Sequence, residues 1–217
     1  MLQIKNQNKS WQEGRAKFIT FIVTKDCQLA CKYCYLVGKN EKERMSFEIA
    51  KKAIDYILDQ KDNPNFSHQS VAWDFIGGEP FLEIDLIDKI CDYIKQELFR
   101  RNHHWFNSYR FSFSTNGINY HTDKVQEFVK KNRDHLSIGI TIDGTELKHD
   151  LNRIYKGNGK GSYKDVVRNI PLWLKQFPGG STKVTISSAD IPYIKESVIH
   201  LYSLGIHEVN INCVFED

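Results

Sequence analysis

The chain has 217 residues and a formal net charge of +3, with 41% hydrophobic and 26% charged residues. This composition is typical of a globular protein with room for one well-packed domain, or for part of a larger one. It excludes a chain that spans a membrane, because no apolar run approaches the ~20 residues needed, and it lacks the clustered positive charge of a nucleic-acid binder.

Short apolar runs alternate with segments of helical periodicity along the chain. Residues 1–16 are polar and are predicted to be a flexible lead-in to a domain over 17–217. Strands are predicted at 17–23, 71–76, 111–114, 136–142, 183–187 and 208–213. Helices are predicted at 47–60 with Ser46 as N-cap, at 85–99, 123–131 and 163–176, and between Pro192 and Gly205. This alternation favours parallel strands covered by helices, in an open barrel or a doubly wound sheet.

Three of the five cysteines follow the first predicted strand, in Cys27-Gln-Leu-Ala-Cys31-Lys-Tyr-Cys34. Three thiolates on a polar loop indicate a [4Fe–4S] cluster with one iron open to an outside ligand. A zinc site would need a fourth ligand, and neither a second CxxC pair nor a well-spaced histidine pair follows. Disulfides are not expected, since an odd number of cysteines and the lack of a secretory signal indicate a reducing compartment.

Three further motifs lie at the ends of predicted strands: Gly77-Gly78-Glu79-Pro80, Ser114-Thr115-Asn116-Gly117, and Thr141-Ile142-Asp143-Gly144 followed by His149-Asp150 and Arg153. Each has a plain structural interpretation. The glycine pair and the Asn-Gly pair are turn signals, and His149-Asp150 fits a turn or a helix cap better than a metal-dependent hydrolase pair. A functional interpretation is also open, because glycine admits a ligand close to the backbone and the arginine fork binds a carboxylate.

Two other features are assigned no function. Gly157-Asn-Gly-Lys-Gly161 lacks the spacing of a phosphate-binding loop and is predicted to be an ordinary loop. Cys91, on a predicted helix, and Cys213, at the end of the last predicted strand, are expected to be buried, inert thiols.

The C-x3-C-x2-C pattern with Tyr33 before its last cysteine resembles the signature of the radical S-adenosylmethionine (SAM) superfamily, and the three strand-end motifs resemble that family's further motifs in matching order. The resemblance implies a partial (β/α)6 TIM-like barrel and two cofactors, a [4Fe–4S] cluster and SAM. It implies that Cys27, Cys31 and Cys34 bind the cluster. It implies SAM contacts for Tyr33 at the adenine, for Gly77, Gly78, Glu79 and Pro80 at the amino group, for Ser114 and Asn116, and for Thr141 and Arg153 at the carboxylate. No residue is assigned a catalytic role.

The last of these motifs most resembles peptide-modifying members, the SPASM-type maturases and anaerobic sulfatase-maturating enzymes. By that likeness the chain is expected to cleave SAM reductively and to abstract hydrogen from a peptide or protein, forming a crosslink or thioether in the cytoplasm, with a flavodoxin- or ferredoxin-type reductant. No later cysteine cluster is present, so we expect the C-terminal auxiliary-cluster domain to be missing or supplied by a separate chain. The alternatives are a glycyl-radical-type activating enzyme and an Fe–S electron-transfer or scaffold module.

Overall fold

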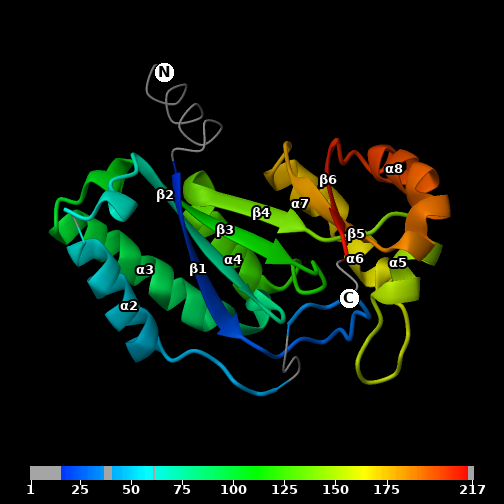
Figure 1. Ribbon diagram of the computed structural model, residues 1–217, viewed down its shortest axis with the longest axis horizontal. Coiled ribbons are helices and arrows are strands. Elements are labelled where there is room, and N and C mark those ends of the chain that lie inside the picture. Colours follow the sequence, from blue (N-terminus) through cyan, green and yellow to red (C-terminus); the bar gives the residue numbers. More distant parts are fainter. Residues whose placement is uncertain (1–15, 37–40, 61, 215–217) are drawn as a thin grey trace.

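The computed structural model describes residues 16–36, 41–60 and 62–214, and parallel strands form its framework. One sheet has the order β1 (Ala16–Thr24), β2 (Ser70–Gly77), β3 (Tyr109–Thr115), β4 (Leu136–Ile140), and β5 (Ser181–Ile186) pairs separately with β6 (Glu208–Cys213). Each of these strand pairings is parallel. The expected lead-in lies outside the described residues, except for Ala16, which begins β1. The α/β fold with a parallel sheet is therefore confirmed (Figure 1).

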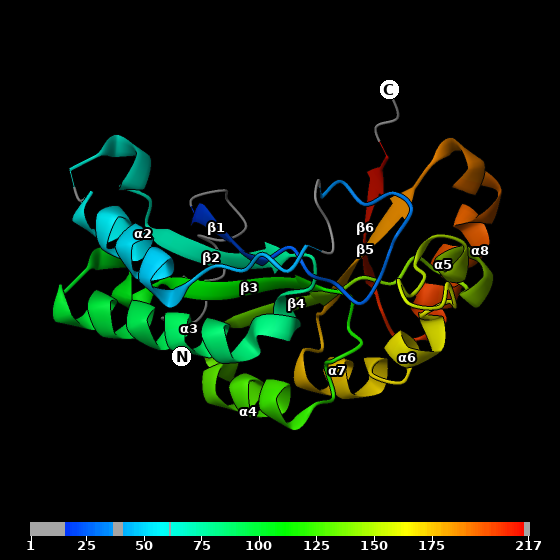
Figure 2. The same cartoon turned by 90° about the horizontal axis from the view of Figure 1, so that it is seen from below.

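Helices connect the strands, and α3 and α4 lie along one side of the four-stranded sheet (Figure 2). The helices are α2 (Phe47–Asp59), α3 (Ile84–Arg100), α4 (Asp123–Asn132), α5 (Glu146–Asn152), α6 (Tyr163–Val167), α7 (Ile170–Gln176) and α8 (Ile194–Ser203). Short 3-10 segments cover Pro64–Phe66, Pro80–Glu83, His104–Asn107, Arg133–His135 and Ser188–Tyr193. In the part of the chain described here, no helix has both the length and the apolar character to cross a membrane.

Alternate residues of the strands face the helices and form the core. Phe21, Phe75 and Phe113 come from neighbouring strands and stack in a row, with ring centroids 5.7 Å and 5.2 Å apart. Such burial of aromatic side chains is the main source of stability in a sheet of this kind. The intervening residues face the other side, where Phe18 of β1 is 65% exposed. One face of the sheet is thus packed and the opposite face remains accessible.

One predicted helix needs correction, and one helix was not predicted. The segment 163–176 is not one helix, because it divides into α6 and α7 before Pro171. Proline has no backbone N–H and its ring conflicts with the preceding turn, so a new helix begins there. Helix α5 was not predicted, although Thr145 caps it by accepting a hydrogen bond from the Lys148 N–H at 3.4 Å. Ser46, by contrast, is the predicted N-cap of α2, accepting from the Ile49 N–H at 3.2 Å.

Side chains, rather than a backbone ladder, join β4 to β5. The Thr182 hydroxyl donates to the Ile140 carbonyl at 2.7 Å and accepts from the Ile142 N–H at 3.1 Å. The Trp173 indole N–H donates to the Ile138 carbonyl at 2.8 Å. These contacts satisfy the Ile138 and Ile140 carbonyls and the Ile142 N–H, which would otherwise need a neighbouring strand as hydrogen-bond partner. Strand β4 ends at Ile140 and not at 142 as predicted.

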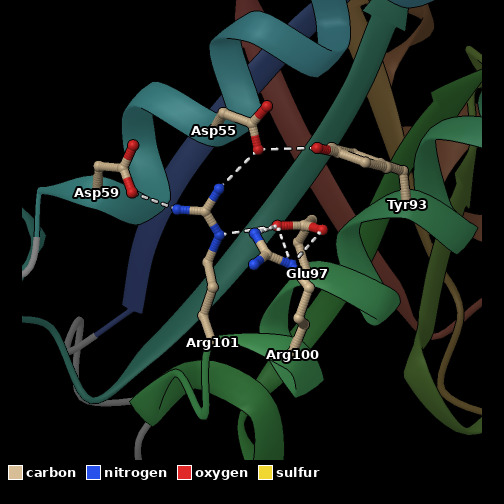
Figure 3. A network of polar contacts seen from close by, with 6 residues as sticks. All are labelled: Asp55, Asp59, Tyr93, Glu97, Arg100 and Arg101. Carbon is tan, nitrogen blue, oxygen red and sulfur yellow. Dashed lines mark hydrogen bonds and ion pairs between the residues drawn. The ribbon is translucent and has the colours of Figure 1, made fainter.

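A network of charged side chains ties α2 to α3 on the outer surface (Figure 3). At its centre, Arg101 donates to Glu97 at 2.9 Å and to Asp55 at 2.7 Å, and it also contacts Asp59. Arg100 donates to the same Glu97 carboxylate at 2.5 Å and 2.9 Å. Hydrogen bonds from Arg100, followed by those from Arg101, lower the pKa of Glu97 to about 2 against the opposing effect of burial.

Glu97 is expected to make stability depend on acid pH. Since its pKa falls from 4.5 in the unfolded chain to about 2 in the folded one, its contribution is full above pH 4.5 and is lost as the pH falls toward 2. We expect Glu97→Gln to lower the unfolding free energy at pH 7 by roughly 2 to 3 kcal/mol, with a deficit that shrinks as the pH approaches 2. Urea unfolding at a series of pH values measures this, with the exposed Glu127→Gln as control. Parallel pH profiles for wild type and Glu97→Gln would contradict it.

Candidate functional site

The motifs predicted at the strand ends lie together at one edge of the sheet. Because β1 to β4 are parallel, their carboxyl ends share that edge, which is where functional groups gather in such folds. Figure 1 shows the loop after β1, in blue, running along this edge toward the yellow loop after α5. The segments joined here by hydrogen bonds are 24–33, 77–81, 114–118, 141–143 and 152–156.

The cysteine loop is held by the segment that follows α5. Ala30 N–H donates to the Ile154 carbonyl at 2.8 Å, and Lys32 N–H donates to the Asn152 carbonyl at 3.1 Å. A third bond runs from the Lys156 N–H to the Gln28 carbonyl at 3.0 Å. The two segments therefore pair as a short antiparallel ladder around the bridge between Leu29 and Tyr155. This pairing holds the cysteine loop, which contains no strand.

The three cysteines of the loop are free thiols with different exposure. Cys27 is buried, whereas Cys31 and Cys34 are partly exposed. The Cys27 sulfur accepts a hydrogen bond from the Leu29 N–H at 3.3 Å. In the described ranges, no three histidine, cysteine or acidic side chains converge as they would around a single metal ion. In a [4Fe–4S] cluster each thiolate binds a different iron, so its cysteines need not meet at one point.

Gly77 and Gly78 are needed for packing against the start of the cysteine loop. A Cβ on Gly78 would lie 2.1 Å from the Asp26 carbonyl oxygen, and one on Gly77 would lie 2.3 Å from that of Thr24. At this closeness the backbones hydrogen-bond, with Gly78 N–H donating to Thr24 at 2.8 Å and Glu79 N–H donating to Asp26 at 2.9 Å. The structure thus gives the two glycines a packing role against the chain's own backbone, and the ligand contact expected from the sequence stays a prediction.

The Glu79 carboxylate lies inside the protein and joins the ends of β2 and β3. One oxygen accepts from the Phe81 N–H at 3.0 Å and the Thr115 hydroxyl at 2.6 Å, and the other accepts from the Asn116 N–H at 2.7 Å. Burial raises the pKa of Glu79, while these donors act in the opposite direction. Pro80 is buried and opens the 3-10 turn after Glu79. Both residues thus shape the turn beside the cysteine loop.

Ser114 and Thr141 face the accessible side of the sheet at adjacent strand ends. The Ser114 hydroxyl accepts a hydrogen bond from the Lys183 ammonium group of β5 at 3.1 Å. Thr141 follows β4, where its N–H donates to the Thr115 carbonyl at 2.9 Å and its side chain is partly exposed. Asn116 instead points toward the cysteine loop and donates to the Gln28 side-chain carbonyl at 3.1 Å.

Tyr33 of the cysteine loop forms a polar group with the buried Asp143 and Arg153, and is itself partly buried. The Tyr33 hydroxyl donates to Asp143 at 2.5 Å and accepts from Arg153 at 2.9 Å. Burial raises the pKa of Tyr33, so its hydroxyl stays protonated. Burial lowers the pKa of Arg153, but the attraction of Tyr33, Cys31 and Asp143 outweighs it and raises the pKa. Arg153 is only 6% exposed, and its Nε has no hydrogen-bond partner among the described residues.

His149 and Asp150 support neighbouring segments and do not form a hydrolase pair. His149 Nδ1 accepts from the Asp143 N–H at 3.3 Å, which places the proton on Nε2, 3.0 Å from the Ser162 hydroxyl oxygen. Burial, with nearby positive charge, lowers the pKa of His149 well below its usual value, so the ring is neutral. Asp150 accepts from the Tyr163 N–H at 2.9 Å, at the start of α6. Asp150 thus lies within α5 and bonds the first residue of α6, whose N-cap position is occupied by Ser162.

Other residues of the site were not singled out from the sequence. Gln28 and Lys183 had no motif to mark them, although Gln28 lies between two cysteines that did. The ion pair of Lys156 with Asp26 at 2.5 Å joins residues that are far apart in the chain. Cys91 is buried as predicted, whereas Cys213 is exposed at the end of β6 because that strand forms the outer edge of its sheet.

The parallel α/β fold, with a three-cysteine loop at the carboxyl edge of its sheet, defines a class of protein, and the sequence identifies it. The model of the Radical SAM superfamily matches residues 21–206, so the chain belongs to that superfamily. The partial barrel and the cofactors that the sequence motifs implied are confirmed with it: this family of enzymes uses a [4Fe–4S] cluster and SAM.

The proteins similar to this chain include maturase-type members. It is 35% identical over 196 residues to an uncharacterized protein of Methanocaldococcus jannaschii, covering 89% of this chain and 61% of the relative. It is 30% identical over 155 residues to the serine-type anaerobic sulfatase-maturating enzyme of Bacteroides thetaiotaomicron, covering 69% of this chain and 34% of the enzyme. A solved structure of anSMEcpe with bound AdoMet and the Kp18Cys peptide has a TM-score of 0.75 at 18% identity, covering 92% of this chain and 51% of that one. The chain thus spans about a third to three fifths of their lengths.

Two features of the site fit the family's cofactors. The buried Arg153 Nε is a donor that lacks an acceptor among the described residues, as expected if a ligand carboxylate supplies one. The Asn116 amide N–H is directed at the Cys27 sulfur at 3.8 Å. A hydrogen-bond donor in this position suits a cluster thiolate, whose sulfur is negatively charged and accepts hydrogen bonds. The side chains present are therefore compatible with an anionic cofactor and a cluster at this edge.

Proposed function

We propose that the chain is the catalytic core of a radical SAM enzyme that modifies a peptide or protein. The observation that carries the proposal is the assembly of the cysteine loop, the Gly77–Pro80 turn and Arg153 at one edge of the sheet. The substrate class is supported by the sulfatase-maturating relative and by the peptide in the similar anSMEcpe structure. A peptide crosslink or thioether remains the expected product.

Each part of the site has a proposed role. Cys27, Cys31 and Cys34 hold the cluster, and the Gly77–Pro80 turn presents backbone groups to the SAM amino group. Arg153 Nε and the Thr141 hydroxyl hold the SAM carboxylate, while Ser114 and Asn116 border the same space. Tyr33, expected at the adenine, also keeps Arg153 in position through the bond between them.

When bound, the cluster and SAM would supply one-electron reductive chemistry and the abstraction of a hydrogen atom from the substrate. The protein binds, orients and shields these groups. The electron requires a one-electron donor, for which a flavodoxin- or ferredoxin-type protein is proposed. We also propose that substrate recognition involves a further domain or a partner chain with auxiliary clusters, as in SPASM-type enzymes.

The proposal is tested with anaerobically reconstituted protein, SAM and dithionite, in the presence of synthetic peptides that carry deuterated serine, cysteine or glycine. We expect 5′-deoxyadenosine to form and to gain deuterium from at least one peptide, as measured by mass spectrometry. No 5′-deoxyadenosine from protein with an intact cluster would overturn the enzyme assignment and favour an electron-transfer module. 5′-Deoxyadenosine without deuterium from any peptide would overturn the substrate class.

A further inference from the structure

The Asn116 side chain connects the motif at the end of β3 to the cysteine loop. Its amide nitrogen lies 3.8 Å from the Cys27 sulfur and 3.1 Å from the Gln28 side-chain oxygen. An amide nitrogen carries two hydrogens, so one contact can be made by each. Asn116 is only 5% exposed and Cys27 only 3%, so water does not compete strongly for either group.

The orientation of this amide is fixed by its other neighbours. The Asn116 side-chain oxygen accepts from the Ile118 N–H at 3.0 Å. Because a backbone N–H can only donate, the atom facing it is the oxygen, and the nitrogen must point to Cys27. The Asn116 backbone N–H is held in turn by the buried Glu79 carboxylate at 2.7 Å. The donor is therefore preorganised before any cofactor binds.

We propose that Asn116 is a positioning residue that raises the reduction potential of the cluster by donating an N–H···S hydrogen bond to the Cys27 thiolate. A reduced cluster carries one more negative charge than an oxidised one, and hydrogen bonds to its sulfurs stabilise that charge. In a buried site the effect is larger than in water. This role refines the implied SAM contact of Asn116 and rests on the proposed binding of the cluster by Cys27.

Asn116→Asp tests the proposal because it keeps the oxygen that accepts from Ile118 and replaces the donor with an oxygen facing the sulfur. In an EPR-monitored redox titration of the reconstituted full chain, we expect the ratio of reduced to oxidised cluster at a fixed potential to fall about tenfold, which is ~59 mV for one electron. Asn119→Asp is the matched control, since it adds the same charge in the same turn without facing Cys27, and we expect its ratio to stay within about twofold of wild type. Equal ratios for the two variants would overturn the proposal.

A second measurement covers the case in which Asn116→Asp does not bind the cluster. Wild-type protein labelled with ¹⁵N-asparagine should show a nitrogen coupling to the reduced cluster by pulsed EPR, and absence of that coupling would overturn the proposal. The two proposals fail differently. Wild-type protein that takes up no cluster contradicts the proposed function, whereas normal SAM cleavage with an unchanged potential in Asn116→Asp contradicts only the role of Asn116.

Discussion

Cys34→Ala protein is expected to lose both the cluster and SAM cleavage. Three thiolates bind three of the four irons and leave one iron open. Removal of one thiolate leaves only two protein ligands for the four irons. Cys34 lies at the end of the cysteine loop, where its N–H donates to the Cys31 carbonyl at 3.2 Å, and its side chain is partly exposed. Alanine preserves this backbone contact, so the fold should survive. Iron content and the broad visible absorption of the reconstituted protein measure the loss, and 5′-deoxyadenosine formation should fall to background.

The control is Cys213→Ala, which also removes a free thiol outside the core. Cys213 is exposed at the end of β6, away from the cysteine loop in sequence. We expect this variant to keep full iron content and full SAM cleavage. If Cys34→Ala retained a [4Fe–4S] spectrum and cleavage comparable to Cys213→Ala, the assignment of Cys34 as a ligand would be wrong.

The second large effect is expected from a single methyl group at Gly78. In Gly78→Ala the new Cβ would lie 2.1 Å from the Asp26 carbonyl oxygen, which is backbone and cannot move aside alone. The turn and the cysteine loop must separate, with loss of the Gly78–Thr24 and Glu79–Asp26 hydrogen bonds. Overpacking and two lost hydrogen bonds together cost roughly 3 kcal/mol. Urea unfolding measures the cost, and the displaced loop should also take up less iron.

Gly157→Ala provides the matched comparison, because no described residue beyond its two chain neighbours has an atom within 4 Å of the added Cβ. Its unfolding free energy should stay within about 0.5 kcal/mol of wild type. Two glycine variants with the same stability and the same iron content would show that the Gly78 contact does not hold the loop.

Much of the framework could be predicted because it depends on local patterns. β6 has the predicted bounds, and α2 begins after its predicted cap, since apolar alternation and capping are properties of neighbouring residues. The division of the helix could have been predicted from Pro171. It was missed because residues on both sides of the proline have helical periodicity. The junction of β4 with β5 could not be predicted, because a threonine hydroxyl there replaces backbone pairing.

The site, too, has features that the sequence predicts and features that it does not. Its segments were predicted to meet because parallel strands bring their carboxyl ends together. The hydrogen bond between Tyr33 and Asp143 was not predicted, since the two residues are 110 positions apart and no sequence pattern links them. The close packing of Gly78 against the Asp26 backbone was not predicted for a related reason, because the sequence does not show which segments lie next to each other.

The antiparallel ladder between the cysteine loop and residues 152–156 has a consequence for biogenesis. The loop emerges early during synthesis, yet its docking partner is made more than a hundred residues later. Until that segment has left the ribosome, the loop has its contacts with Gly78, Glu79 and Asn116 but lacks the three backbone hydrogen bonds to residues 152–156. We therefore expect the iron–sulfur delivery machinery to act after residues 152–156 have been made rather than on the nascent cysteine motif.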